Sequence, residues 1–246
     1  MTGTTALEQL RVLRDIVSAS GLTWWLDSGT LLGIVREGRL LPQDHDIDIS
    51  VWQAGEDDVR RLRERLADAG YEVLLDYYQG EVFRLWLWPK VAGWRRVDLR
   101  VFRDWDGRFA WSPRTERRDY FAHWPAWWQT RARNIFRRIW LFWNYRLRGK
   151  APRWAWPFLD VLTYTHCWWV PLHFFQRTVV LEGGWAVPED YRGYLAYRYG
   201  NWETPVTNWQ FKVDDPTYKK FRPEQLFGMA RGAGQAAATQ RSEQRA

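Results

Sequence analysis

The feature that most constrains this chain is an alternating run of acidic and mostly apolar residues, DHDIDISV, at positions 44–51. Side chains along a strand point to opposite faces in turn, so Asp44, Asp46 and Asp48 are predicted to share one face. Three carboxylates on one face repel one another unless a cation lies among them. Oxygen ligands of this kind suit Mg²⁺ or Mn²⁺ shared with substrate phosphates. The run therefore predicts a metal and phosphate site on a strand whose other face enters a core.

A glycine-containing turn, SGTLLG, precedes this strand at positions 28–33. It reads as a tight turn that opens a short helix, with Ser28 as its cap and an end near Gly38. Free backbone N–H groups at such a helix start favour phosphate oxygens. We therefore expect the helix start and the acidic strand to serve one site.

The residues that carry a family resemblance are LDSGTLLGIVREGRLLPQDHDIDI at 26–49, and GGWAVPEDYRGYLAYRYGNWETPV at 183–206. The first resembles the signature of the LicD/fukutin family of phosphotransferases, and the second resembles the family's C-terminal motif. Two positions depart from the pattern, since Gln43 stands where Trp is usual and His45 where bacterial members often have Asp. Neither departure removes a carboxylate from the alternating positions.

The resemblance implies a nucleotidyltransferase-type fold of the α+β class, in which a mixed sheet is flanked by helices. It implies transfer of a phospho-alcohol, such as phosphocholine or ribitol phosphate, from a CDP-linked alcohol donor to a glycan or glycolipid acceptor. By this resemblance Asp46 and Asp48 hold the metal, while Asp98 on a later strand binds it or takes the acceptor's proton. The alternative for Asp98 is an exposed strand residue paired with Arg96 or Arg100.

Phosphate or nucleotide contacts are expected from the signature and from one nearby strand: Ser28, Gly29, Thr30, Gly33, Arg36 and Arg84. Lys90 is a further candidate, although an ordinary surface charge is the simpler reading for Lys90 and Arg84. Asp27 either orients the turn or the acceptor, or acts as a plain cap.

Secondary structure elsewhere follows from periodicity and turn residues. We expect helices from about Thr5 to Gly21 and from Glu56 to Ala69, and another that Pro188 begins and Gly200 ends. The expected strands are 23–26, 46–51, 71–76, 81–88 and 94–102, and 104–125 is expected to be loop.

Composition bounds the remaining possibilities. The 246 residues fit one domain, and the single cysteine, Cys167, excludes an internal disulfide and a cysteine-built zinc site. The net charge of +7 and 20 Trp favour an anionic, lipid or glycan partner. We expect a catalytic domain over 1–210 with an aromatic-rich helical insertion at about 104–180, a C-terminal extension at 211–228 and a disordered tail at 229–246.

The insertion raises the question of membrane contact. Residues 131–148 predict a basic, aromatic amphipathic helix. It either lies on an anionic membrane surface or packs its aromatic face on the core and turns its arginines toward nucleotide or glycan. The run 161–175 is too short to span a bilayer. His166 and His173 are two helical turns apart, but no third ligand accompanies them. The opening MTGTTALEQL predicts no secretory signal, and hence a cytoplasmic enzyme, peripheral at the inner membrane face if 131–148 binds lipid.

Two other functions remain open from the sequence. The same fold could transfer a nucleotide monophosphate, in which case pyrophosphate rather than CMP would be released. A non-catalytic module could instead bind membrane surfaces or nucleic acid through the basic residues. The complete set of carboxylates argues against loss of the site, and acidic groups in the cleft argue against nucleic acid there, so no nucleic acid is expected as a partner.

Overall fold

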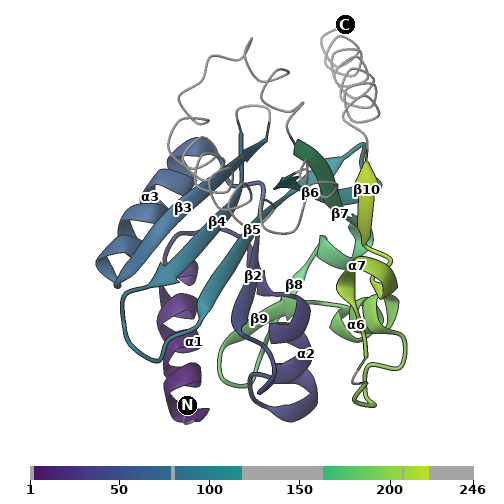
Figure 1. Ribbon diagram of the computed structural model, residues 1–246, viewed down its shortest axis with the longest axis horizontal. Coiled ribbons are helices and arrows are strands. Elements are labelled where there is room, and N and C mark those ends of the chain that lie inside the picture. Colours follow the sequence, from purple (N-terminus) through teal and green to yellow (C-terminus); the bar gives the residue numbers. More distant parts are fainter. Residues whose placement is uncertain (1–2, 79–80, 118–162, 207, 222–246) are drawn as a thin grey trace, which may run out of the picture.

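The computed structural model describes residues 3–78, 81–117, 163–206 and 208–221, and every element below lies within these ranges (Figure 1). In chain order the elements are α1 (Gly3–Ser18), β1 (Trp24–Leu26), α2 (Ser28–Glu37), β2 (Asp46–Trp52), α3 (Glu56–Asp68), β3 (Tyr71–Tyr78), β4 (Glu81–Pro89), β5 (Arg96–Trp105), β6 (Phe109–Arg117), β7 (Thr163–Pro171), the 3₁₀ turn η4 (Leu172–Phe175), β8 (Thr178–Leu181), β9 (Trp185–Pro188), α6 (Tyr191–Tyr199), α7 (Phe211–Asp214) and β10 (Tyr218–Phe221).

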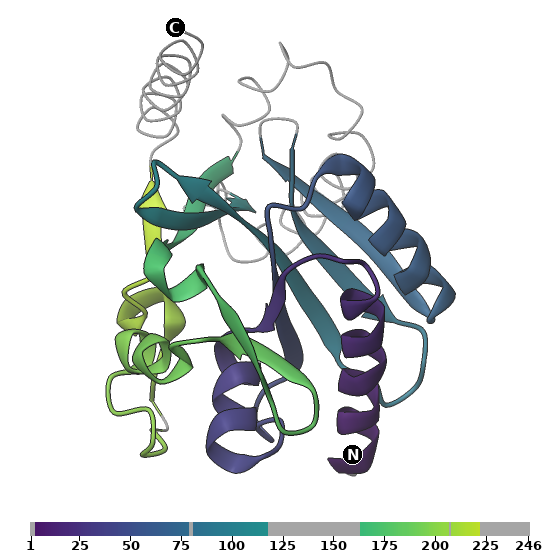
Figure 2. The same cartoon turned by 180° about the vertical axis from the view of Figure 1, so that it is seen from behind.

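One mixed sheet of eight strands organises the fold. Its main path is β1-β2-β5-β6-β7-β10, and β4 joins β3 to β5. The β2–β5 pair is parallel, and the other strand pairs described for this sheet are antiparallel. Figure 2 shows α1, α3 and the β8–β9 hairpin on the near face of the sheet, while α2 and α6 lie close to each other on the other side. The mixed sheet with flanking helices confirms the expected α+β class.

The register of β2 on β5 creates the site. Asp48 lies opposite Asp98, and Ile47 lies opposite Val97, so the acidic side chains of both strands share one face. Ile47 and Ile49 are fully buried on the other face, beneath α1 and α3, as the alternation of DHDIDISV predicts. Burial of the apolar face fixes this register, because a shift by one residue would place the carboxylates in the core.

One stretch differs from the local sequence expectation, and the expected C-terminal extension contains a strand. The segment 104–125 was expected to be loop, but β5 continues to Trp105 and β6 covers Phe109–Arg117, pairing along its whole length with β7. The partner strand lies more than forty residues later in the chain, beyond any local pattern. The segment 211–228, expected as an extension, includes β10, which adds a strand to β7.

The C-terminal half holds two further corrections. Pro188 was expected to begin a helix, but it is the last residue of β9, and α6 starts at Tyr191 with Asp190 as its N-cap. His166 and His173 do not share a helical face. His166 lies on β7 and its Nδ1 is hydrogen-bonded to the Tyr218 hydroxyl, whereas His173 lies on the 3₁₀ turn.

The amphipathic segment 131–148, and most of the expected helical insertion, fall outside the described residues. Within the described part of the chain, no helix is both long enough and apolar enough to cross a bilayer.

Candidate active site

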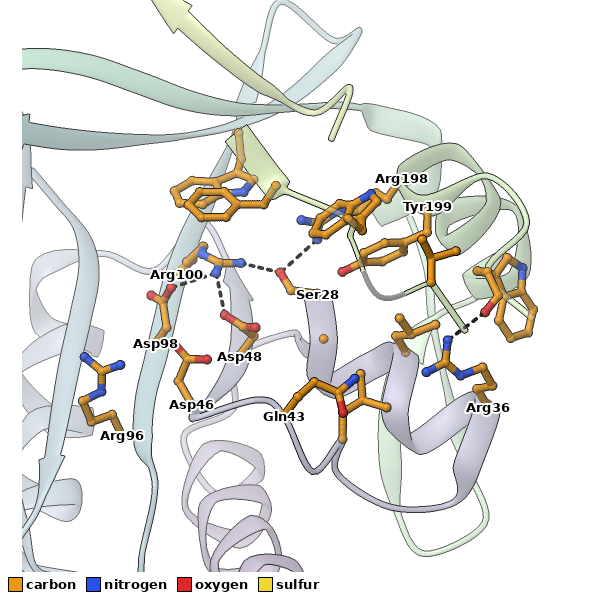
Figure 3. A pocket seen from close by; sticks show the side chains of 18 of the residues that line it. Ser28, Arg36, Gln43, Asp46, Asp48, Arg96, Asp98, Arg100, Arg198 and Tyr199 are labelled. Atoms are coloured by element: carbon orange, nitrogen blue, oxygen red, sulfur yellow. Dashed lines mark hydrogen bonds and ion pairs between the residues drawn. The ribbon is translucent and has the colours of Figure 1, made fainter. Parts of the chain in front are cut away.

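A pocket of about 490 Å³ lies where the N-terminus of α2 meets the acidic face of β2 and β5 (Figure 3). The C-terminal half of the chain forms its other wall through β7, α6 and the segment that follows α6. A volume of this size is typical of a small-molecule site. The charged side chains that line it are Arg36, Asp46, Asp48, Arg84, Arg96, Asp98, Arg100 and Arg198.

Three carboxylates meet at one end of the pocket. Asp46 and Asp48 project from β2, and Asp98 projects from the neighbouring β5. Arg100 lies among them, and its Nη2 donates to Asp48 Oδ1 at 2.5 Å and to Asp98 Oδ2 at 2.7 Å. Asp46 makes no hydrogen bond or ion pair with any residue that the structure describes. One carboxylate of the set is therefore uncommitted, while two already face a guanidinium.

Asp98 is also held by a second arginine. Arg84 on β4 donates from Nε to Asp98 Oδ1 at 2.5 Å and from Nη2 to Asp98 Oδ2, a bidentate pair buried to within a few per cent. Neither the exposed position nor the pairing with Arg96 that the sequence left open for Asp98 is seen; Arg84 and Arg100 are the partners. Both carboxylate oxygens of Asp98 therefore accept hydrogen bonds, and they hold the guanidinium groups of Arg84 and Arg100 beside the pocket.

Burial dominates the electrostatics of Asp48. It raises the pKa of Asp48 to about 8 even though Arg100 acts in the opposite direction, and the carboxylates of Asp98 and Asp46 add to the rise. Burial and the neighbouring Asp46 also raise the pKa of Asp44. At Asp48 and Asp44, burial and neighbouring carboxylates therefore outweigh the effect of the nearby guanidiniums on the pKa.

The start of α2 is built on a buried carboxylate. Asp27 is the N-cap, accepting a hydrogen bond from Ser28 N at 2.6 Å, and Ser28 follows with φ +49° as the first residue of the helix. A positive φ is costly for a residue other than glycine, so surrounding contacts must hold Ser28 in place. Those contacts come from Arg100 on β5 and Arg198 on α6, each of which donates to Ser28 Oγ at 2.9 Å.

The hydroxyl of Ser28 therefore has a defined orientation. A guanidinium can only donate, so the Arg100 and Arg198 bonds use both lone pairs of Ser28 Oγ. The remaining tetrahedral direction carries the hydrogen, which makes the hydroxyl a donor. Since Ser28 lines the pocket, this donor is part of the pocket's lining.

The pocket gathers most of the site residues expected from the sequence. Seven of them line it: Ser28, Gly29, Arg36, Asp46, Asp48, Arg84 and Asp98. Arg36 lies at the opposite end from the carboxylates and donates to the backbone oxygen of Trp202 at 3.2 Å.

Five expected residues do not line the pocket but mostly shape it. Asp44 packs against Gly29, and Thr30 is buried, its hydroxyl accepting from Asp48 N at 2.9 Å. Gly33 allows the backbone of 39–41 to cross α2 closely. Asp27 is fully buried beneath Ser28 and is the N-cap of α2, a role that the sequence left as one alternative for it. The expectation that Ser28 is the cap was wrong by one residue, because Ser28 is the first residue of the helix. Lys90 lies exposed after β4.

Sequence reasoning assigned neither Arg100 nor Arg198 to the site, although Arg100 was named as one possible partner of Asp98, a pairing that the structure shows. Arg100 stands two residues after Asp98, so the period of a strand already put both on one face, and that signal was available. Arg198 had no such signal, because its carboxylate partners are Asp215 and Asp27, the latter 171 residues away. The aromatic wall formed by Trp86, Trp168 and the rings after α6 was equally invisible to local patterns.

Within the described residues, no three carboxylate, histidine or cysteine side chains are already arranged as ligands around one point. A cation at the acidic end would therefore complete its ligand shell with water or with substrate oxygens, as Mg²⁺ commonly does.

Comparison with known proteins gives one family and several distant relatives. The family model described as "LicD/FKTN/FKRP, nucleotidyltransferase domain" matches residues 21–142. An uncharacterized protein of Rickettsia prowazekii is 29% identical over 76 residues, covering 30% of this chain and 29% of that protein. The ribitol 5-phosphate transferase FKRP of Homo sapiens is 33% identical over 63 residues, covering 26% of this chain and 12% of that protein.

The matched regions thus span less than a third of the curated relatives' own lengths. Among solved structures, the lincomycin-bound lincosamide antibiotic adenylyltransferase LnuA matches 45% of this chain and 62% of that chain, with 20% identity and a TM-score of 0.32.

Proposed function

We propose, since this chain carries a nucleotidyltransferase domain of the LicD/FKTN/FKRP family, that it is a metal-dependent phosphotransferase. In this proposal it moves a phospho-alcohol from a CDP-linked donor to a hydroxyl group of a glycan or glycolipid in cell-surface polysaccharide modification. The similarity to a protein named ribitol 5-phosphate transferase supports the choice of reaction class.

The observation that carries the proposal is the junction of the α2 start with the acidic ends of β2 and β5. The Ser28 hydroxyl, the Arg100 guanidinium and the Asp46 carboxylate line the same pocket. Arg100 Nε is buried and makes no hydrogen bond with the described residues, so this guanidinium keeps one unsatisfied donor at the edge of the pocket. Cationic donors beside a carboxylate pair suit a diphosphate and a divalent cation together.

The residues present fit Mg²⁺ or Mn²⁺. Asp46 and Asp48 would hold the ion, because they lie two residues apart on one strand face and Asp46 makes no hydrogen bond or ion pair with the described residues. The raised pKa of Asp48 supports this, since its burial calls for more positive charge than Arg100 supplies. When bound, the cation would neutralise phosphoryl oxygens and help the nucleotide to leave.

The side chains of the pocket would have separate roles in the reaction. Ser28 and Arg100 would hold the diphosphate, and Asp98 would position Arg84 and Arg100 rather than act directly, because both of its oxygens are engaged. The acceptor hydroxyl oxygen would form a bond to the phosphorus that carries the alcohol. The bond from that phosphorus to the bridging oxygen would break, CMP would leave, and the acceptor's proton would pass to a carboxylate of the Asp46 and Asp48 pair.

The test is a donor screen with CDP-choline, CDP-ethanolamine, CDP-glycerol and CDP-ribitol, with Mg²⁺ or Mn²⁺ and a glycolipid extract, following CMP release. Asp46→Asn should lower CMP release by roughly a hundredfold or more, because it removes a charged ligand at the reacting phosphate. Asp57→Asn on exposed α3, an identical chemical change away from the pocket, should leave it unaltered. Binding of Mn²⁺, measured by electron paramagnetic resonance, should be lost in Asp46→Asn alone.

Two outcomes would overturn the proposal. Release of pyrophosphate from a nucleoside triphosphate, without CMP from any donor, would indicate nucleotidyl transfer instead. CMP release that Asp46→Asn leaves unchanged would remove this pocket from the reaction.

A further inference from the structure

We infer that the guanidinium of Arg100 takes the place of a second metal ion, so that this site binds a single divalent cation and not a pair. The inference rests on the proposed function, since it concerns the cation that the proposed reaction uses. It follows from the contacts that Arg100 makes with the carboxylates of β2 and β5.

The three carboxylates at the acidic end of the pocket offer two positions for a cation. Asp46 and Asp48 lie two residues apart on β2, and Asp48 lies opposite Asp98 on β5. Asp48 is therefore the middle member of the set. One position lies between Asp46 and Asp48, and the other lies between Asp48 and Asp98. Enzymes that act on phosphates often place an ion in each of two such positions, about 4 Å apart.

The protein itself fills the position between Asp48 and Asp98. Arg100 Nη2 lies 2.5 Å from Asp48 Oδ1 and 2.7 Å from Asp98 Oδ2, so one nitrogen atom contacts an oxygen of each carboxylate (Figure 3). A Mg²⁺ ion bonds to carboxylate oxygens at about 2.0–2.1 Å. An ion that bridged these two oxygens would have to lie where this nitrogen lies. The guanidinium and a metal ion therefore exclude each other from this position.

Further contacts hold Arg100 in that place. Its Nη1 donates to Ser28 Oγ at 2.9 Å, and its guanidinium lies 4.3 Å from the centre of the Trp168 ring. Arg100 is only 4% exposed, on a strand that pairs with both β2 and β4. A metal ion that displaced it would have to break these contacts and leave a buried guanidinium without its carboxylates, which is costly.

The position between Asp46 and Asp48 differs. Asp46 makes no hydrogen bond or ion pair with the described residues, and the contact of Arg100 with Asp48 is made through Oδ1, so Oδ2 has no such partner there. With one ion at this position, Arg100 would supply the second positive charge beside the phosphates. A guanidinium only donates hydrogen bonds. It therefore adds charge without coordinating the acceptor hydroxyl, whose proton is left to the carboxylates.

The experiment measures the bound ions by electron paramagnetic resonance of Mn²⁺, with the full chain alone and with CDP added. We expect the wild type to bind about one Mn²⁺ per chain in the pocket, with the spectrum of an isolated ion. Two ions about 4 Å apart would couple magnetically and broaden the spectrum, so a pair is recognised by its spectrum as well as by the count.

A variant of Arg100 should open the second position. Arg100→Met removes the guanidinium and keeps an unbranched side chain, so binding should rise to about two Mn²⁺ per chain and the coupled spectrum should appear. Arg108→Met removes the same charge from the exposed turn between β5 and β6, outside the pocket lining. This control should keep the wild-type count and spectrum.

The outcomes separate the inference from the proposed function. A coupled pair in the wild type would overturn the inference, while metal-dependent CMP release would still support the function. If no Mn²⁺ binds and no donor yields CMP, both fail. If Arg100→Met is folded by circular dichroism but binds no more Mn²⁺ than Arg108→Met, the inference is overturned, because the guanidinium then does not keep a second ion out. If Arg100→Met does not fold, the wild-type spectrum decides.

Discussion

Asp27 is the residue at which the N-terminal half and the C-terminal half of the fold are joined by hydrogen bonds. Its fully buried carboxylate accepts hydrogen bonds from Ser50 Oγ at 2.6 Å, from Tyr194 Oη at 2.8 Å and from Arg198 Nη1 at 3.0 Å. Burial acts to raise the pKa of Asp27, but Arg198, Arg100 and the hydrogen bonds outweigh it, so the pKa lies below its ordinary value. The folded protein therefore favours the charged form of Asp27, and the negative charge contributes to stability.

Replacing that charge should destabilise the protein. Asp27→Asn leaves buried guanidiniums short of a counter-charge, and should lower the free energy of unfolding by roughly 3–5 kcal/mol at pH 7. Urea unfolding followed by tryptophan fluorescence measures this, with Asp57→Asn on the exposed face of α3 as the matched change. Equal effects of the two substitutions would contradict the argument.

The difference should depend on pH in one direction. A carboxyl group whose pKa is lower in the folded state stabilises the protein above its unfolded pKa, about 3.9, and this contribution is lost as pH falls through the folded value. The gap between wild type and Asp27→Asn should therefore be full at pH 6 and narrow markedly below pH 4. A gap that widened on acidification would show that the charge is not the cause.

At the level of elements, α2 is defined by how closely the following segment crosses it. A Cβ at Gly33 would lie 2.6 Å from the backbone oxygen of Arg39 and 3.0 Å from Leu41 N. The backbone atoms there cannot yield as a flexible side chain could. This close crossing carries the chain from the end of α2 to the start of β2, and so sets where the acidic residues emerge.

We expect Gly33→Ala to cost several times more than an equivalent change elsewhere. The added methyl group must displace backbone, which costs at least about 3 kcal/mol in stability. Gly55→Ala, at the N-cap of α3, meets only a side-chain oxygen of Asp58 at 3.5 Å and should cost about 1 kcal/mol. Chemical denaturation of both variants measures the loss in free energy of unfolding. A small loss for Gly33→Ala would mean that the backbone of 39–41 can move away from α2.

Elements that obey a local rule were predictable from the sequence. The alternation after Asp44 gave β2, and Gly38, with φ +66° at the C-cap, ended α2 as expected. The expected strand at 94–102 gave most of β5 and the position of Asp98 beside Asp48.

Elements that depend on distant pairing were not predictable. β6 pairs with β7 across a long separation, and β10 joins them only in three dimensions. The same limit applied to the site. Carboxylates at strand spacing were identified, and the same spacing places Arg100 on the face of Asp98, whereas Arg198 comes from α6, whose proximity no local pattern encodes.

At the scale of the whole molecule, the reactivity of Cys167 measures how stably β6, β7 and β10 pair at one end of the sheet. It lies on β7, opposite Pro113 of β6 and Lys219 of β10, and it is fully buried. Burial raises the pKa of its thiol well above the usual value, and a thiol that stays protonated is a poor nucleophile.

Cys167 should therefore react with a disulfide reagent only when the sheet opens. We expect labelling at pH 8 to be slower in the native protein than in urea by roughly a thousandfold or more, as for an opening that costs at least about 4 kcal/mol. Mass spectrometry of labelled protein over time gives the rate. Complete labelling of native protein within minutes would show that β10 does not cover this position stably.

The bond between Arg198 and Asp27 also has a consequence for the order in which the molecule is made. Ribosomal synthesis adds Asp27 first and Arg198 only after 171 further positions. A nascent chain that has passed β5 already carries its carboxylates, but nothing yet holds Ser28 from the α6 side. Ser28 is therefore held from both sides only late in synthesis, after the C-terminal segment that contains α6 has emerged.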